Sequence, residues 1–181
     1  KLLERLTYSR KLLVIGMVFV IPIVILTYQL VQAQNIDIAI AQNELAGSAY
    51  LRPTVSLLQH LQQHRGAAST FLKGDATFRD VMLEKQAAIE ADIAAIDALD
   101  ATYGERLKSS ATWAELKDTW AKLQSEVETL APADSLARHT ALIREVLNFR
   151  TSVADVSGLT LDPDVDSYYV MLASVTNYPE I

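Results

Sequence analysis

The 181-residue sequence predicts an all-α protein, in which a transmembrane helix continues into an elongated antiparallel bundle of the four-helix type. Three observations favour this class. An uncharged apolar stretch covers residues 12–31, and the apolar residues after it recur at alternating intervals of three and four. No stretch alternates apolar and polar residues as a half-buried strand does. Because the first outer helix is longer than its partners, the bundle is either one module or two stacked modules.

The apolar stretch from Leu12 to Val31 is long enough to cross a bilayer. Twenty residues of α-helix rise ~30 Å, which is the thickness of the hydrocarbon core. Four basic residues lie before this stretch and no Lys or Arg follows until Arg52, so we expect the amino end in the cytoplasm. The predicted order is a cytoplasmic stub at 1–11, a transmembrane helix at 12–32 and a periplasmic helical-bundle sensor domain at 33–181.

Two other interpretations of this stretch remain open. A cleaved signal peptide also has a basic start, but its apolar core is usually about 7 to 15 residues long. A buried core helix rarely has so many successive uncharged positions beside a basic cluster. Pro22 is compatible with a membrane helix, where proline is tolerated.

Composition excludes several functional classes. The sequence has no cysteine, which excludes disulfides and zinc-cysteine sites. Of 16 basic and 22 acidic residues, four basic and one acidic lie within residues 1–11, so the remainder carries a net charge of −9. An acidic outer domain disfavours nucleic acid and anionic lipid as partners. The chain starts with lysine and stops at Ile181 without a closing feature, so we expect a longer parent protein with an incomplete bundle here.

The first outer helix is predicted over residues 33–72. Its apolar and small residues form a heptad seam, the pattern of helices that pack at a shallow angle. Pro53 removes one backbone donor, so we expect a bend there and no stop. The turn is predicted at 73–75. The seam comprises Ile36, Ile40, Asn43, Gly47, Tyr50, Thr54, Leu57, Leu61, His64, Ala68 and Phe71.

Four further helices follow from the same periodicity. The second extends from Phe78 to Tyr103, with Gly104 ending it, and the third covers residues 113–130. A break at 131–134 precedes a helix from about Ser135 to Ser157, for which Gly158 is the expected C-cap. A fifth begins at Asp162-Pro163.

A second stripe beside the seam contains the candidate ligand-binding residues. It is mostly apolar, so the polar residues at its centre lie on a partly buried surface, with the Arg65 guanidinium in the middle. A guanidinium removed from water needs an acceptor, and a carboxylate or nitrate matches its planar fork. The alternative is that Arg65 pairs with an internal acid or reaches solvent. The stripe comprises Leu51, Val55, Leu58, Gln62, Arg65, Ser69 and Leu72.

Other polar patterns are weaker. His60 and His64 have metal-ligand spacing, but Gln62-Gln63 replaces part of the zinc-protease motif, so two ordinary helix histidines are favoured and no metal or cofactor is expected. The aspartates at 162, 164 and 166 begin like a calcium loop, yet Ala173 stands where the bidentate glutamate belongs. Helix capping explains them better. Tyr168 and Tyr169 are expected to be core or interface aromatics, with a place in a ligand pocket as the alternative.

Catalysis within this sequence is not expected. No nucleophile with a base, no glycine-rich phosphate loop and no paired catalytic carboxylates can be assigned from these spacings.

Three segments resemble the amino-terminal sensory region of bacterial methyl-accepting chemotaxis receptors. They are KLLERLTYSRKLLVIGMVFV, ELAGSAYLRPTVSLLQHLQQHRGAAS and SGLTLDPDVDSYYVM, about a third of the chain. Arg65-Gly66 is similar to the arginine-glycine motif of nitrate-sensing helical domains, although His64 stands where an acidic residue is more usual. The resemblance implies a homodimer in the inner membrane, with a second membrane helix, a relay module and a cytoplasmic signalling hairpin. Sensor histidine kinases and diguanylate cyclases share such outer domains.

Taken together, these patterns predict a chemoreceptor input module that is not an enzyme. It binds a small, anionic ligand outside the membrane through Arg65, Gln62, Ser69 and His64, and signals by helix displacement. One alternative is the sensor region of a histidine kinase or diguanylate cyclase. Another is a structural or assembly protein whose bundle binds another protein and no small molecule.

Overall fold

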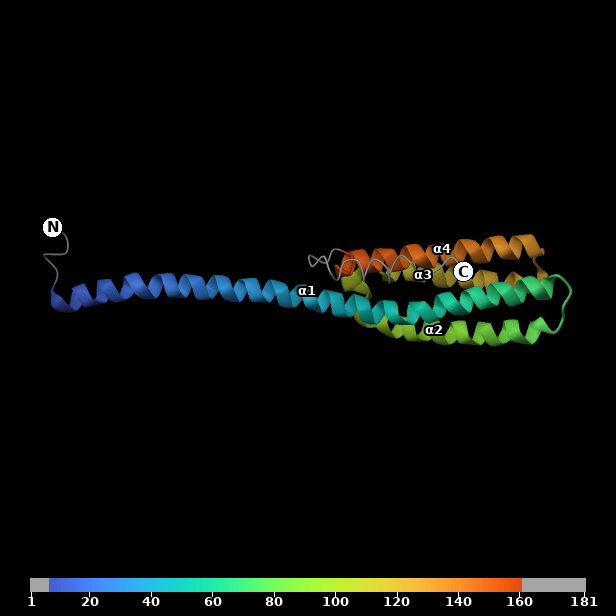
Figure 1. Cartoon of the computed structure of the whole chain (residues 1–181), viewed down its shortest axis with the longest axis horizontal. Coiled ribbons are helices and arrows are strands. Elements are labelled where there is room, and N and C mark those ends of the chain that lie inside the picture. Colours follow the sequence, from blue (N-terminus) through green and yellow to red (C-terminus); the bar gives the residue numbers. More distant parts are fainter. Residues whose placement is uncertain (1–6, 161–181) are drawn as a thin grey trace. The chain divides into compact units, whose positions relative to one another are not determined.

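The computed structural model describes residues 7–160, and the secondary structure in this range is entirely helical (Figure 1). The all-α prediction is confirmed. The elements in chain order are α1 (Tyr8–Leu72), α2 (Phe78–Leu107), α3 (Ser110–Glu126), the short 3₁₀ helix η2 (Val127–Thr129) and α4 (Pro132–Ser157). The predicted fifth helix, the aspartates at 162–166 and the tyrosines at 168–169 lie outside the described residues.

The described residues divide into two compact units, one up to residue 42 and the other from residue 43 onward. In the first unit, the described large apolar side chains of α1 are exposed to the surroundings, as Phe19 and Leu26 illustrate at 67% and 63%. α1 includes an 18-residue window with a mean hydropathy of 2.4 and no buried residue. This helix is therefore long and apolar enough to cross a membrane.

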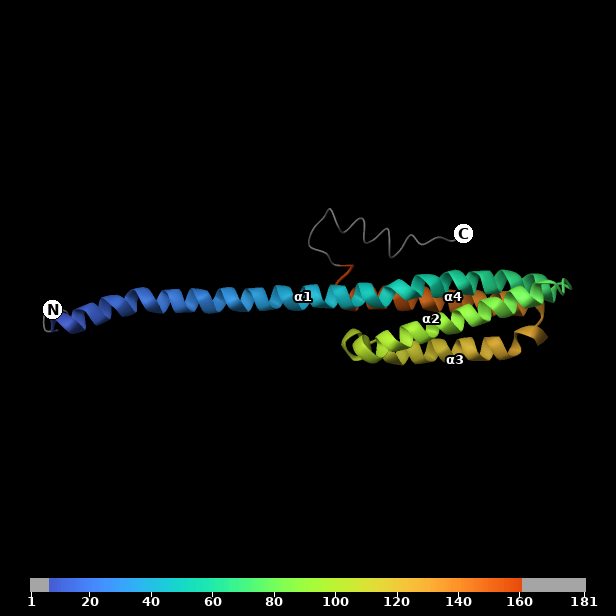
Figure 2. The ribbon, with the colours of Figure 1, turned by 90° about the horizontal axis from the view of Figure 1, so that it is seen from below.

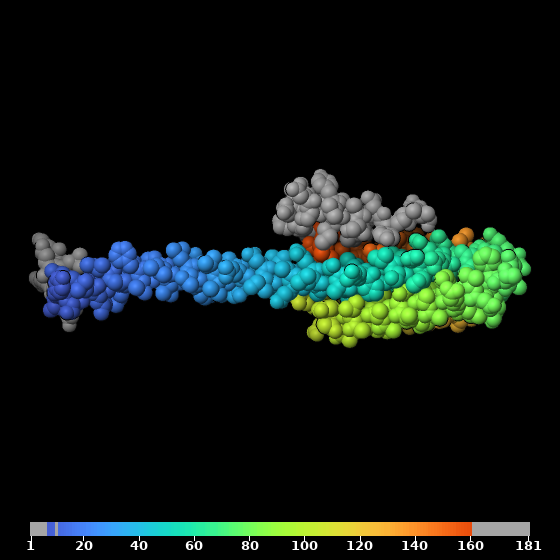
Figure 3. Space-filling view, turned by 60° about the horizontal axis from the view of Figure 1, so that its bottom comes forward, coloured from blue at the N-terminus to red at the C-terminus, as the bar shows by residue number. Residues whose placement is uncertain are grey.

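In the second unit, α1 from residue 43 onward and the three following helices lie side by side as a bundle (Figures 1 and 2). The surfaces of α1 and α2 adjoin along the length of the bundle (Figure 3). The predicted seam of α1 is buried from Gly47 to Ala68, whereas Ile36 and Ile40 are 60% and 49% exposed. The predicted core positions of α3 are also confirmed. They are Trp113, Leu116, Trp120 and Leu123, all nearly inaccessible.

Hydrogen bonds from the polar ends of aromatic side chains connect the helices. Tyr50 on α1 donates its hydroxyl proton to Asp100 on α2 at 2.8 Å, and the Trp113 indole N–H on α3 donates to Asp97 at 2.7 Å. The Trp120 indole N–H donates to Glu90 at 2.8 Å. Large apolar rings are thus buried while their polar atoms reach carboxylates at the edge of the core.

Of the two glycines predicted to end helices, Gly158 does so and Gly104 does not. Gly158 caps α4 with φ of 86°, a left-handed conformation that costs glycine little. Gly104 does not end α2, which continues to Leu107 and is capped by Lys108 at φ of 54°. Gly104 is buried, and a Cβ there would overlap Ser110 and Asp100. It therefore serves the close approach of the start of α3 and not the end of α2.

Pro53 and Pro132 have different positions in their helices, one in the interior and one at the start. α1 continues through Pro53, as expected for a residue that removes one donor without stopping the helix. α4 begins at Pro132, three residues earlier than predicted. Proline suits the first helical turn because its missing N–H would have no intrahelical acceptor there.

Candidate anion-binding site

Arg65 lies half-buried on α1 and faces α4. Its Nη1 atom is 3.4 Å from Oγ1 of Thr140, which is long for a hydrogen bond. The Thr140 hydroxyl donates its own proton to the Leu136 carbonyl at 2.8 Å, so a lone pair remains to accept from Arg65. Within residues 7–160, Arg65 makes no ion pair with a carboxylate. Most of the guanidinium donors are therefore available to a ligand.

Gln62 and Ser69 flank Arg65 on the same stripe, three residues before it and four residues after it. Helical residues at these intervals share a face. Both are half-buried, and in the described part of the chain neither side chain makes a hydrogen bond. Gly66, the next residue, is exposed, and a Cβ on it would meet nothing within 4 Å. The stripe thus presents an amide, a guanidinium and a hydroxyl beside open space.

His64 lies behind this surface and is completely buried. Its Nδ1 is 2.8 Å from Nε2 of His139 on α4. His139 Nδ1 lies 2.6 Å from the Ser135 carbonyl oxygen, so that nitrogen carries the proton. His139 Nε2 is then the acceptor, and His64 donates from Nδ1. Two imidazoles therefore form a directed hydrogen-bond chain from α1 to the backbone of α4.

Burial keeps this histidine pair neutral. Desolvation, followed by the neighbouring His139, lowers the pKa of His64 from 6.5 to about 3. Desolvation also lowers the pKa of His139; its hydrogen bond to the Ser135 carbonyl opposes this, and the charge of Arg65 adds to it. At neutral pH the positive charge at this position is therefore that of Arg65.

The two histidines singled out by their spacing have different partners. His60 Nδ1 lies 2.6 Å from Asp92 Oδ2 on α2, whereas His64 contacts α4. No cluster of three potential metal ligands occurs among the described residues. The spacing therefore places two histidines on one helix but toward different neighbouring helices.

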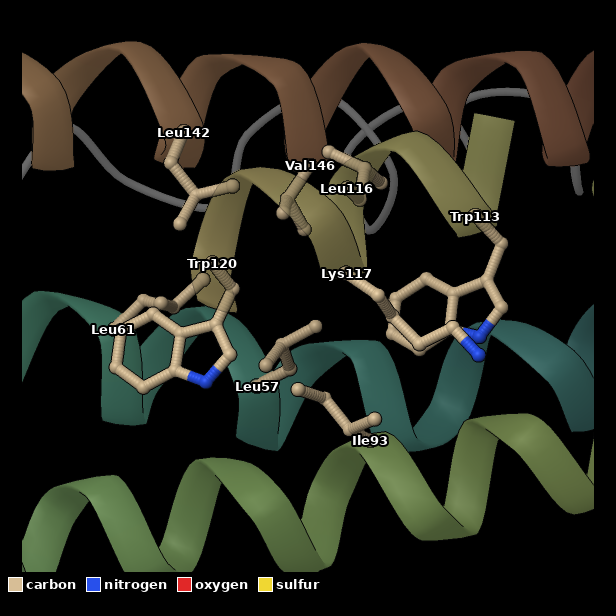
Figure 4. Close-up of a pocket in the computed structure, with 9 residues that line it drawn as sticks. All are labelled: Leu57, Leu61, Ile93, Trp113, Leu116, Lys117, Trp120, Leu142 and Val146. Atoms are coloured by element: carbon tan, nitrogen blue, oxygen red, sulfur yellow. The ribbon is translucent and has the colours of Figure 1, made fainter. Parts of the chain in front are cut away.

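The hollows of the bundle do not suit an anion. One is a cavity of about 10 Å³ between Trp113 and Trp120, with room for about one water molecule (Figure 4). Another is a groove of about 300 Å³ between α3 and α4. Glu115 and Glu145 line this groove, and their carboxylates repel anions. The candidate site on the α1 stripe is therefore the better position for a negative ligand.

A protein-family model described as nitrate and nitrite sensing (NIT) matches residues 56–179, which include the whole Gln62–Ser69 stretch. The chain belongs to the NIT family. NIT domains are extracellular sensors of bacterial signalling proteins, among them chemoreceptors and histidine kinases. The chain is thus an extracellular ligand-sensing input module, and family membership is compatible with either output. No curated protein and no solved structure matches the chain.

The structure identifies residues near the candidate site of this NIT domain that the sequence patterns did not indicate. His139 and Thr140 on α4 contact His64 and Arg65 on α1. A further guanidinium, Arg150, is only 3% exposed on α4. The spacing of α4 could have indicated that His139 and Arg150 are buried. His139 lies four residues before the buried Ile143, and Arg150 lies four residues after the buried Val146.

Proposed function

We propose that this NIT domain binds nitrate or nitrite at the stripe of α1, with Arg65 as the principal ligand group and Gln62 and Ser69 beside it. The observation that carries the proposal is that Arg65 is half-buried while its guanidinium has no carboxylate partner among residues 7–160. The family match covers this part of the helix. His64 is assigned to the same site as the residue behind Arg65.

The chemistry of the ligand supports this assignment. Nitrate and nitrite are planar anions with oxygen acceptors, and guanidinium presents parallel N–H donors in one plane. Hydrogen bonds to charged groups are worth about 1.5–3 kcal/mol each. The amide of Gln62 and the hydroxyl of Ser69 supply further donors without adding charge. Chloride has no planar fork to match and is expected to bind more weakly.

For signalling, we propose that the anion favours one of two packings of α1 against α4. Because Arg65 and Thr140 come from different helices, a ligand between them responds to a shift of about 1–2 Å between α1 and α4. α1 is one continuous helix from Tyr8 to Leu72. A displacement of its outer part is therefore passed along the same helix toward the apolar stretch.

The remaining parts of the proposal concern the whole receptor. We propose an inner-membrane protein with a cytoplasmic amino end, a transmembrane segment at 12–32, and a bundle outside the membrane that acts without catalysis. A homodimer with a chemoreceptor output is the favoured arrangement. A histidine kinase or diguanylate cyclase output is the alternative. These features rest on the charge distribution, the apolar stretch and the resemblance to chemoreceptors.

Calorimetry on the whole chain in detergent or nanodiscs tests the ligand. Nitrate, nitrite and chloride are titrated into the wild type and into Arg65→Gln, which retains a polar side chain but lacks the charge. Loss of a charge-assisted contact predicts about 10- to 100-fold weaker nitrate binding. Arg79→Gln is the matched control, because Arg79 is an exposed arginine paired with Glu128 on a different part of the bundle.

The outcomes are distinct. Nitrate binding that is lost in Arg65→Gln and kept in Arg79→Gln supports the site. Unchanged nitrate affinity in Arg65→Gln overturns the assignment of Arg65. No heat or thermal shift with any of the three anions counts against anion sensing and favours a bundle that binds another protein.

A further inference from the structure

Two contacts between α1 and α4 lie next to each other and involve consecutive residues on both helices. His64 contacts His139 at 2.8 Å, and Arg65 contacts Thr140 at 3.4 Å. The first pair is buried, whereas Arg65 is half-buried and Thr140 is exposed. A proton site and a proposed anion site are therefore adjacent in the same helix interface.

The hydrogen-bond chain defines where an additional proton can bind. His139 Nδ1–H donates to the Ser135 carbonyl, and His64 Nδ1–H donates to His139 Nε2. His64 Nε2 is buried and has no hydrogen-bond partner in the described part of the protein. It is the basic nitrogen at the open end of this hydrogen-bond chain, and a proton added there makes His64 a cation.

The groups around this nitrogen come from each neighbouring helix. On α3, the Trp120 indole lies at 79° to the His64 ring with the centroids 5.0 Å apart. Glu90 on α2 accepts the N–H of that indole. On α1, the next residue, Arg65, carries a positive charge that lowers the pKa of His139.

The surroundings on α4 are compensated or neutral. Ser135 contributes its carbonyl to His139, which supplies the second imidazole. Arg138 is ion-paired with Glu126, so its charge is largely offset. Arg65 is thus the charged residue whose compensation changes when an anion binds.

We propose that the anion at Arg65 and a proton on the buried His64–His139 pair bind cooperatively, so that this domain senses nitrate or nitrite together with acidity. The inference rests on the proposed anion site. Without an anion, the Arg65 charge opposes a proton on the pair by lowering the pKa of His139, and the pair stays neutral. A bound anion neutralises that charge and removes the repulsion. By reciprocity, a proton on the pair raises the affinity for the anion by the same factor.

The linkage has a measurable form. One proton taken up with each anion makes the affinity for nitrate rise as pH falls, by at most about tenfold per pH unit. The gain appears below the usual histidine range, because burial and Arg65 both lower the pKa of His139. At neutral pH the pair is unprotonated and the affinity is set by the stripe of α1 alone.

The experiment is nitrate calorimetry on the whole chain at about pH 7.5 and about pH 4, nearer to the lowered pKa of His64, each in two buffers with different ionisation enthalpies. The buffer dependence of the measured heat counts the protons taken up. The wild type is compared with His139→Gln and His64→Gln, in which the pair is broken on one side or the other. His60→Gln is the matched control, since His60 contacts Asp92 and lies outside the pair.

We expect proton uptake and tighter nitrate binding at the lower pH in the wild type and in His60→Gln, and neither effect in the two variants of the pair. Nitrate binding with the same affinity and no proton uptake at both pH values overturns this inference and leaves the anion site intact. No nitrate binding at either pH overturns the anion site as well.

A second measurement needs no ligand. Imidazole NMR titration of Arg65→Gln tests the repulsion directly, because removing the guanidinium charge is expected to raise the pKa of His139 relative to the wild type. An unchanged pKa of His139 shows that Arg65 does not act on the pair and overturns the coupling whatever the ligand is. Circular dichroism at both pH values verifies that each variant remains folded.

Discussion

The buried histidine pair predicts that acid destabilises the bundle, and His64→Gln isolates this effect. The folded-state pKa of His64 is lowered from 6.5 to about 3, so the unfolded chain binds a proton more readily than the folded one. Stability is therefore complete above about pH 6.5 and falls as the pH drops toward 3. At about pH 5 the expected loss from His64 alone is about 2 kcal/mol. His139, whose pKa is lowered in the same direction, adds to it.

Urea unfolding followed by circular dichroism, at about pH 7.5 and about pH 5, measures the effect. Other groups also titrate in this interval, so the informative quantity is the difference between the wild type and His64→Gln. Glutamine can still donate to His139 Nε2 but does not titrate. We expect the variant to lose about 2 kcal/mol less than the wild type on acidification. Equal losses in the wild type and in His64→Gln refute the assignment of a neutral buried pair.

Two glycines give predictions of opposite sign. Gly66→Ala is expected to stabilise the bundle by about 0.5–1 kcal/mol in urea unfolding, because Gly66 is an exposed residue within a helix with open space around its Cα; destabilisation would contradict this. Gly104→Ala is expected to cost about 1–3 kcal/mol, because its Cβ would displace the Asp100 carboxylate, whose Oδ1 accepts hydrogen bonds from Tyr50 and Ser109. A variant with wild-type stability would contradict this.

Much of the bundle could be predicted from spacing. The alternation of threes and fours in α3 identified Trp113, Trp120 and Leu123 as core residues before any packing was known, because a helix buries one face and that face repeats every 3.6 residues. The same rule identified the buried part of the α1 seam. Spacing did not separate Ile36 and Ile40 from it, since a periodic pattern does not say where the neighbouring helices end.

The ends of helices were harder to predict. The sequence predicts that both Gly158 and Gly104 end a helix. Gly158 has the left-handed conformation that a cap requires, whereas Gly104 lies inside α2. Glycine occurs at helix ends for its backbone freedom and inside bundles for its small size. The identity of the residue does not reveal which property is used. The position of Ser110 on the following helix decides it.

Only the part of the candidate site on α1 could be predicted from the sequence. Gln62, Arg65 and Ser69 could be grouped because they share one face of α1, and their half-burial is as predicted. Whether they bind a ligand stays a prediction. Their counterparts on α4, His139 and Thr140, lie about 75 residues away in the chain, and no local pattern relates them to α1.

The sequence by itself determined that this chain is helical, that one stretch of α1 is apolar enough for a membrane, and which face of α3 and of the outer part of α1 is buried. These properties depend on residues within a few turns of each other. Only the tertiary structure decided that His64 meets His139, that Arg65 faces a hydroxyl and no described carboxylate, and that His60 contacts a different helix. Such pairings depend on the register between antiparallel helices, which is set by packing of the whole core and not by any single segment.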